Sequence, residues 1–135
     1  MKILIDTNVL ISALVFRGRI NTVIKELLES EHELFISTYI LSEFEEKLSE
    51  KWPDRKKEML RLFQEIGLEV KESTDKVESA LRDIKDDPIL ADAREYDVDI
   101  LLTGDKDFLE SGISNPKICS PNALYELLFR IDGEE

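Results

Sequence analysis

ILIDTNVLISALVF, residues 3–16, decides the fold class of this chain. A short, β-prone apolar run ends at Asp6, and from residue 7 onward the apolar residues recur at helical spacing. The stretch therefore predicts a strand, a turn and a helix, in that order. An ionised carboxylate inside an otherwise apolar run is costly unless something compensates its charge. Asp6 is thus a position where we expect chemistry as well as structure.

The rest of the chain continues this alternation of apolar strands and amphipathic helices. We expect further strands at residues 33–37, 68–71, 99–103 and 117–119. We expect further helices at residues 20–30, 40–51, 54–66, 75–84, 87–96 and 121–131. Asp87 and Pro88 have the residue types of an N-cap and a first helical position, and Gly67 stands where a helix ends. The expected order is β-α-α-β-α-α-β-α-α-β-β-α, with no helix between the last two strands.

This order predicts an α/β fold. Strands that alternate with helices, and that are themselves mostly apolar, indicate a parallel sheet covered on both faces by right-handed crossovers. We expect a three-layer α/β/α sandwich around a mostly parallel sheet of four to five strands. A chain of 135 residues is long enough to bury one core, so residues 1–135 are predicted to form a single domain.

The overall charge restricts the partners of the protein. A formal net charge of −12 argues against broad, unassisted attraction to nucleic acid. A polyanionic substrate would need a local positive charge to bind this acidic protein. Cations held by carboxylates would supply that charge, because a bound cation inverts the local electrostatic field. The single cysteine, Cys119, excludes an intramolecular disulfide and is expected in the core, which fits a reducing cytoplasm. No apolar stretch is long enough to span a membrane, and no cleavage site follows the N-terminal run, so we expect neither insertion nor secretion.

Acidic residues follow the predicted strands. Asp6 follows the first strand and Asp105 follows the strand at residues 99–103, while Glu43 and Asp87 stand early in helices. In open α/β sheets, ligands bind beyond the carboxyl ends of the strands. We therefore expect these four carboxylates to converge at one edge of the sheet.

Each acid also has an ordinary explanation. The three aspartates are suitable helix caps or turn residues, and periodicity alone does not distinguish Glu43 from Glu45 or Glu46. Capping alone does not explain why several acids would gather at one edge. Two carboxylates about 4 Å apart repel by about 4 kcal/mol at an effective dielectric constant of about 20, so such a cluster should protonate, spread apart or bind cations. Oxygen ligands without a set of His or Cys favour Mg²⁺ or Mn²⁺, and His32 alone, expected at the surface, makes no zinc site.

Five segments carry a resemblance to a known family. They are DTNVLISAL at residues 6–14, SEF with Leu48 at residues 42–48, DPILADA at residues 87–93, DILLTGDKDF at residues 99–108 and SPNAL at residues 120–124. In this order and spacing they resemble the PIN domains, metal-dependent ribonucleases that include the toxin components of many prokaryotic toxin–antitoxin pairs. The resemblance spans nearly the whole chain.

The resemblance implies roles for individual residues. The residues that match the family's catalytic and metal-binding acidic quartet are Asp6, Glu43, Asp87 and Asp105. Asn8 matches a polar residue that supports the first carboxylate, Thr7 and Thr103 match small hydroxyl residues near the site, and Asp107 matches a supporting or alternative metal ligand. Asp92 is a less certain acid, for which a solvent-facing position is an adequate explanation.

The resemblance also implies an activity. One or two Mg²⁺ or Mn²⁺ ions would activate a water for in-line attack on an RNA phosphodiester, with the carboxylates as ligands rather than nucleophiles. The implied products carry a 5′-phosphate and a 3′-hydroxyl, and the implied partners are RNA, an antitoxin protein and a second copy of the chain. An exposed apolar face over residues 9–16 or 124–131 would mark a protein interface.

Basic residues suggest where substrate binds. Arg17 and Arg19 lie in the loop FRGRI, and Lys106 lies within TGDKDF beside Asp105. These three are the predicted substrate contacts. The cluster of basic residues over 51–61 alternates with acids and is more typical of a solvated helix face.

Three other functions can be compared with this prediction. A haloacid-dehalogenase-type phosphatase needs an acid where this chain has Asn8, and a receiver-type signalling domain needs an acidic pair after the first strand and a lysine where Cys119 stands. The third alternative is a PIN-like scaffold that binds RNA or protein with little or no cleavage, and the sequence does not separate it from the predicted endoribonuclease.

Overall fold

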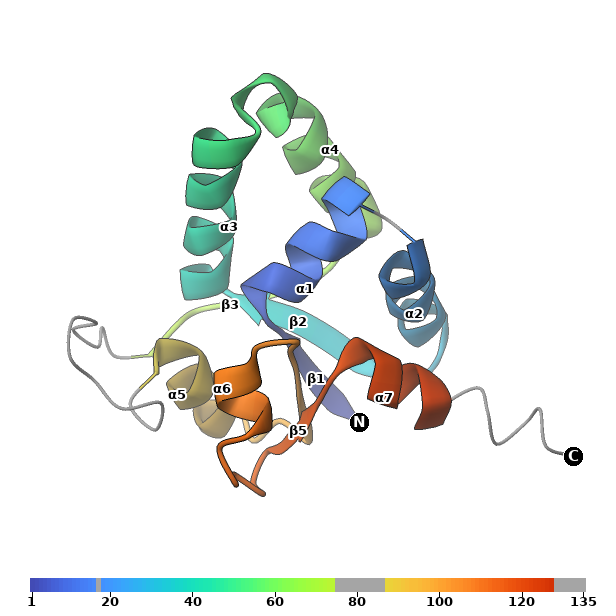
Figure 1. Ribbon diagram of the computed structural model, residues 1–135, viewed down its shortest axis with the longest axis vertical. Coiled ribbons are helices and arrows are strands. Elements are labelled where there is room, and N and C mark those ends of the chain that lie inside the picture. Colours follow the sequence, from blue (N-terminus) through green and yellow to red (C-terminus); the bar gives the residue numbers. More distant parts are fainter. Residues whose placement is uncertain (17, 75–86, 128–135) are drawn as a thin grey trace, which may run out of the picture.

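A computed structural model describes residues 1–16, 18–74 and 87–127 as an α/β domain built on one sheet (Figure 1). Five parallel strands lie in the order β3-β2-β1-β4-β5. The strands are β1 (Lys2–Ile5), β2 (Glu33–Ser37), β3 (Glu69–Lys71), β4 (Ile100–Leu102) and β5 (Lys117–Cys119). All five predicted strands are present, and the sheet is parallel throughout.

The helices connect these strands as crossovers. They are α1 (Thr7–Ile11), η1 (Ser12–Phe16), α2 (Gly18–Glu29), α3 (Thr38–Lys51), η2 (Pro53–Arg55), α4 (Lys56–Ile66), α5 (Pro88–Glu95), α6 (Lys106–Leu109) and α7 (Pro121–Tyr125). The chain moves one way across the sheet from β1 to β3 and the other way from β3 to β5, so right-handed crossovers place α1–α4 on one face and α5–α6 on the other. Accordingly, α1–α4 lie above β2 and α5 lies below it in Figure 1.

The centre of the sheet is covered on both faces. Ile3, Leu4 and Ile5 follow one another in β1, and each is 0% exposed although alternate side chains of a strand point to opposite faces. Cys119 is buried at the end of β5, as predicted, and burial raises the pKa of its thiol. Because β1 is the middle strand of the sheet, its carboxyl end, which precedes Asp6, lies in the core.

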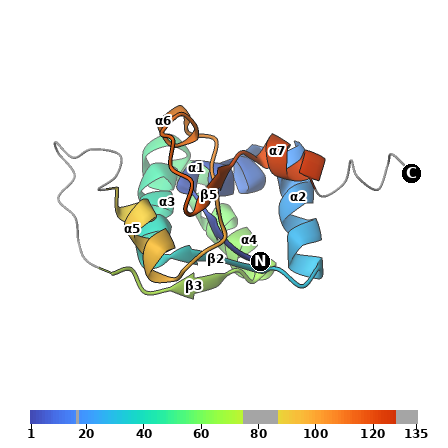
Figure 2. The same cartoon turned by 90° about the horizontal axis from the view of Figure 1, so that it is seen from below.

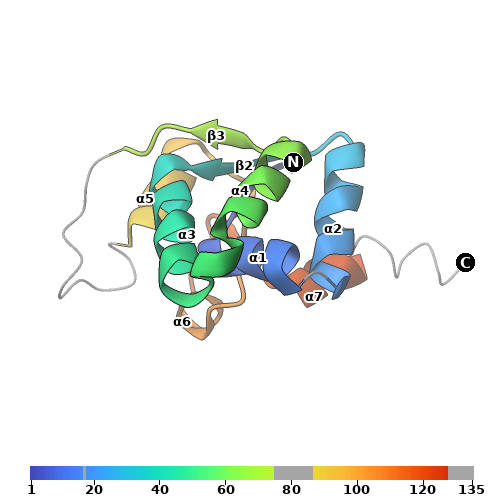
Figure 3. The ribbon, with the colours of Figure 1, turned by 90° about the horizontal axis from the view of Figure 1, so that it is seen from above.

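The helix predicted over residues 7–16 changes character midway. It begins as α1 and continues as the π-helical segment η1, in which the Asn21 side-chain amide donates to the carbonyl of Ala13 at 2.9 Å. Helix α7 packs beside α2, as Figure 2 and Figure 3 both show. The Arg19 guanidinium joins the two, because it donates to the Asn122 side chain at 3.3 Å and lies 4.7 Å from the centre of the Tyr125 ring.

The prediction that no helix separates the last two strands is wrong. Helix α6 lies between β4 and β5, and the Asp105 carboxylate caps it by accepting from the backbone N–H of Asp107 at 2.9 Å. Four residues are too few to show helical periodicity, which is why the pattern did not reveal α6. The helix predicted over 75–84 and the end of the last predicted helix, from residue 128, lie outside the described residues.

Over the described ranges 1–16, 18–74 and 87–127, none of the helices has both the length and the apolar character needed to span a membrane.

Candidate active site

The pairing of β1 with β4 brings Asp6 and Thr103 together. Ile5 is the register partner of Leu102, and the backbone N–H of Asp6 donates to the carbonyl of Leu102 at 3.0 Å. The residues that follow the two strands are therefore neighbours although 97 positions separate them in sequence. One Asp6 carboxylate oxygen accepts from the Thr103 hydroxyl at 2.5 Å and the other from the Thr7 backbone N–H at 2.6 Å. Asp6 is only 5% exposed, so these bonds fix its orientation.

Helix α3 presents one row of side chains to the same edge. Tyr39, Glu43 and Lys47 recur at four-residue intervals and therefore share a helix face. The Thr7 hydroxyl donates to the Glu43 carboxylate at 2.5 Å, and the Lys47 ammonium donates to the Asn8 side-chain oxygen at 3.1 Å. Two consecutive residues of α1 thus hold two successive residues of this row.

The other two acids are helix caps that stand at the same edge. Asp87 caps α5 by accepting from the backbone N–H of Ile89 at 2.8 Å, as its sequence predicts. Asp105 caps α6, and its own backbone N–H donates to the Thr103 hydroxyl at 3.0 Å. Thr103 therefore links the backbone of Asp105 to the carboxylate of Asp6.

These elements enclose a cleft of about 150 Å³ that all four predicted acids line. The complete lining is Asp6, Thr7, Asn8, Tyr39, Glu43, Lys47, Asp87, Ile89, Asp105 and Phe108. The structure thus brings together the predicted quartet from four separate parts of the chain. It also selects Glu43 from the neighbouring acids of α3, because Glu45 and Glu46 are exposed and do not line the cleft.

Burial among like charges makes Asp6 resist ionisation. Desolvation raises the pKa of its carboxyl from 3.8 to about 6, and the charges of Glu43 and Asp105 add to the rise. The hydrogen bonds from Thr103 and Thr7 oppose it without cancelling it. A positive charge placed in the cleft would stabilise the ionised form.

The donor set fits a hard divalent cation. Carboxylate oxygens from Asp6, Glu43, Asp87 and Asp105 are the ligands that Mg²⁺ and Mn²⁺ prefer. Within residues 1–16, 18–74 and 87–127, no three His, Cys, Asp or Glu side chains are already grouped closely enough to hold a metal ion. An ion bound by these acids would therefore require their side chains to move closer together.

Other predicted site residues lie outside this cleft lining. Asp107 and Lys106 are exposed on α6, and only the backbone N–H of Asp107 contacts an acid of the quartet. Arg19 is engaged with α7, and Arg17 lies outside the described residues.

Asn8 lines the cleft but binds Lys47, whereas the hydrogen bonds that support Asp6 come from Thr7 and Thr103.

The structure excludes the solvent-facing position that was one explanation for Asp92. Asp92 is 1% exposed, and it accepts from the Ser73 hydroxyl at 2.9 Å and from the Thr74 backbone N–H at 3.0 Å. It therefore ties α5 to the segment after β3. A helical wheel could not reveal this, because the donors are 18 and 19 residues away in sequence.

Sequence reasoning missed two polar cleft residues, Tyr39 and Lys47. The available signal was their spacing of four residues on either side of Glu43, which places them on its face of the helix. Ile89 and Phe108 complete the lining with apolar side chains.

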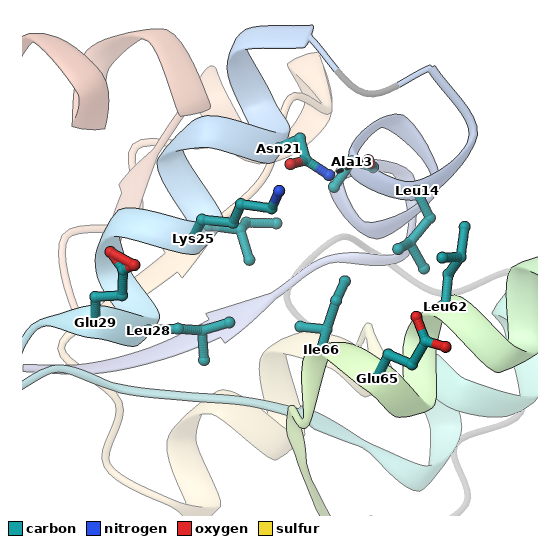
Figure 4. Close-up of a pocket in the computed structure, with 10 residues that line it drawn as sticks. Ala13, Leu14, Asn21, Lys25, Leu28, Glu29, Leu62, Glu65 and Ile66 are labelled. Atoms are coloured by element: carbon teal, nitrogen blue, oxygen red, sulfur yellow. Dashed lines mark hydrogen bonds between the residues drawn. The ribbon is translucent and has the colours of Figure 1, made fainter.

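A second, larger cleft of about 350 Å³ lies between η1, α2 and α4 and contains none of the quartet (Figure 4). Its walls are mostly apolar and include Leu14, Ile24, Leu28, Leu62 and Ile66. Figure 4 shows charged side chains such as Lys25, Glu29 and Glu65 around it. Its mostly apolar walls distinguish it from the acidic cleft.

The profile of the PIN domain matches residues 2–107, which include all four acids of the cleft. The chain belongs to the PIN domain family. PIN domains are generally nucleases. A solved structure supports the fold: the VapBC2 complex from Rickettsia felis bound to a DNA fragment from its promoter contains a chain that is 17% identical, with a TM-score of 0.66. The similarity covers 89% of this PIN domain and 97% of that chain. A comparison with curated proteins finds no match.

Proposed function

We propose that this PIN domain is a metal-dependent endoribonuclease whose quartet Asp6, Glu43, Asp87 and Asp105 holds Mg²⁺ or Mn²⁺. The observation that carries the proposal is the convergence of the four carboxylates on one cleft. The raised pKa of Asp6 supports it, because a buried acid among other acids is stabilised in its ionised form by a bound cation.

The residues of the cleft have two roles: the carboxylates would bind the cation, and their hydrogen-bond donors orient the carboxylates. A bound divalent cation supplies an acidified water and neutralises charge that develops on the phosphate. Thr103 and the Thr7 backbone keep both oxygens of Asp6 in fixed directions, and the Thr7 hydroxyl does the same for one oxygen of Glu43. Such prior orientation lowers the cost of assembling the site around its ligand. The cap bonds of Asp87 and Asp105 each hold one carboxylate oxygen in place.

The test is cleavage of structured and unstructured labelled RNAs by the purified protein in Mg²⁺, Mn²⁺ or EDTA. We expect metal-dependent products from the wild type, and a loss of at least about 100-fold in rate for Asp6→Asn and Glu43→Gln, since both remove a ligand that acts on the transition state. Glu45→Gln is the matched control on the same helix, because Glu45 is exposed and outside the cleft. Equal rates for Asp6→Asn and wild type, or products in EDTA, would contradict the proposal.

The alternative function is a PIN-like scaffold that binds RNA or protein with little or no cleavage. It predicts binding that neither EDTA nor Asp6→Asn changes. The same protein samples, measured by equilibrium RNA binding beside the cleavage assay, separate the two functions.

We further propose a protein partner of the antitoxin kind. The fold neighbour in the VapBC2 complex supports this, as does the apolar cleft of Figure 4. Of the predicted apolar face over residues 9–16, only Phe16 is strongly exposed, at 68%, and it contacts the Trp52 ring edge-on. Co-expression with the protein encoded by the adjacent gene tests the proposal: a stable complex that Leu28→Glu disrupts supports it, and co-purification unaffected by this change contradicts the choice of surface. Light scattering of the protein alone tests the expected homodimer.

A further inference from the structure

Lys47 is the only cationic side chain that lines the acidic cleft in the described part of the chain. It lies one helical turn after Glu43 on α3 and is half-buried. A Glu followed four residues later by a Lys is the favourable order for an ion pair on a helix. Lys47 and Glu43 would therefore be expected to neutralise each other.

The structure keeps this pair apart. Thr7 donates to Glu43, and the side-chain oxygen of Asn8 accepts from Lys47 at 3.1 Å. Among residues 1–16, 18–74 and 87–127, the ion pairs within 4.0 Å are Arg55–Glu58 and Lys71–Glu33, so Lys47 forms none there. Within the described residues its hydrogen-bond partner is the neutral amide of Asn8, and no acid there contacts the ammonium group.

We infer that Lys47 is a phosphate contact for the RNA strand and sets its position beside the acidic quartet. A lysine ammonium is a compact cation with three donors and binds phosphate as a point charge. Asn8 engages one donor, and the described part of the chain supplies no acceptor for the other two, which can donate to phosphate oxygens. In a cleft lined by four carboxylates, an uncompensated cation at the edge attracts the polyanion while the centre holds the metal.

The inference rests on the proposed function only in taking RNA as the ligand. It concerns binding rather than cleavage, so the two can fail separately. It also differs from the predicted contacts of Arg19 and Lys106, because neither lines the cleft.

The experiment is equilibrium binding of a fluorescein-labelled single-stranded RNA by anisotropy, in Ca²⁺ and in the Asp6→Asn background so that no substrate is consumed. Lys47→Gln is compared with Lys51→Gln, which removes the same charge one turn further along α3 at an exposed position outside the cleft. We expect Lys47→Gln to weaken binding about three- to tenfold and to reduce the slope of log K against log salt by about 0.7. Lys47→Arg should retain most of the affinity, and thermal melts confirm that each variant is folded.

Three results overturn the inference. Equal weakening by Lys47→Gln and Lys51→Gln shows that only net charge matters. Tighter binding by Lys47→Gln shows that the lysine competes with the metal for the acids instead of contacting RNA. If the parent protein binds no RNA, there is no RNA phosphate for Lys47 to contact. RNA binding that depends on Lys47, without cleavage by the wild type in Mg²⁺ or Mn²⁺, refutes the nuclease proposal and leaves this one standing.

Discussion

Replacing Asp6 by Asn should stabilise the folded protein at neutral pH in the absence of metal. The Asp6 carboxyl has a pKa of about 6 in the fold against 3.8 when unperturbed, because burial and neighbouring acids disfavour its charge. Since one pKa unit corresponds to about 1.4 kcal/mol, ionised Asp6 costs the folded state about 3 kcal/mol above pH 6. Asn keeps an oxygen for the Thr7 N–H and offers an N–H to the Thr103 hydroxyl, so the variant loses the charge and few contacts.

The pH dependence gives the sign of the effect. Between pH 3.8 and about 6 the folded state retains the Asp6 proton while the unfolded chain releases it, so this group lowers stability as pH rises through that window. The stability difference between Asp6→Asn and wild type should therefore grow from near zero below pH 4 to about 3 kcal/mol above pH 6.

Urea unfolding in EDTA at a series of pH values measures this difference, with Glu45→Gln as the exposed control. Saturating Mg²⁺ should reverse the order at pH 7, because an ion that binds only the folded wild type stabilises it by mass action. A variant that is less stable than wild type by the same amount at every pH would refute the reasoning, since the carboxylate would then carry no ionisation cost.

Three further outcomes follow from the contacts of single residues. Thr103→Val loses the hydroxyl donor to Asp6, so it should raise the pKa of Asp6 and lower the free energy of unfolding in urea by about 1–3 kcal/mol. Thr103→Ser should keep the bond. Equal losses of stability for the two variants would contradict a hydrogen-bonding role. Asp92→Ala should cost about 1–3 kcal/mol in the same assay, because it removes the acceptor of part-buried donors such as the Thr74 N–H. RNA cleavage per folded molecule should change little, and a selective loss of cleavage would refute this structural role. Gly67→Ala should raise the cost of the left-handed backbone (φ 78°) by about 1 kcal/mol, seen as a lower melting temperature, while Gly67→Asn should lose less.

The sequence by itself determined the sheet class and the position of every strand. The central strands β1, β2 and β4 each contain a short buried apolar run, and such local patterns survive folding because backbone pairing and burial act on the same residues. The cap at Asp87–Pro88 and the helix end at Gly67 could likewise be predicted, because capping depends on residues adjacent in sequence. Asp6 and Asp105 were identified by their positions after strands and Asp87 by its capping position, whereas Glu43 was selected by family resemblance.

Only the tertiary structure decided which side chains share the cleft and which contacts hold them. The register of β1 against β4 joins Asp6 to Thr103, and the packing of α1 on α3 selects Glu43 and separates it from Lys47. Asp92 shows the same limit, because it is buried and its donors come from another segment. Helical periodicity assigns a residue to a face but not to a partner, and the partner depends on how distant elements pack against each other.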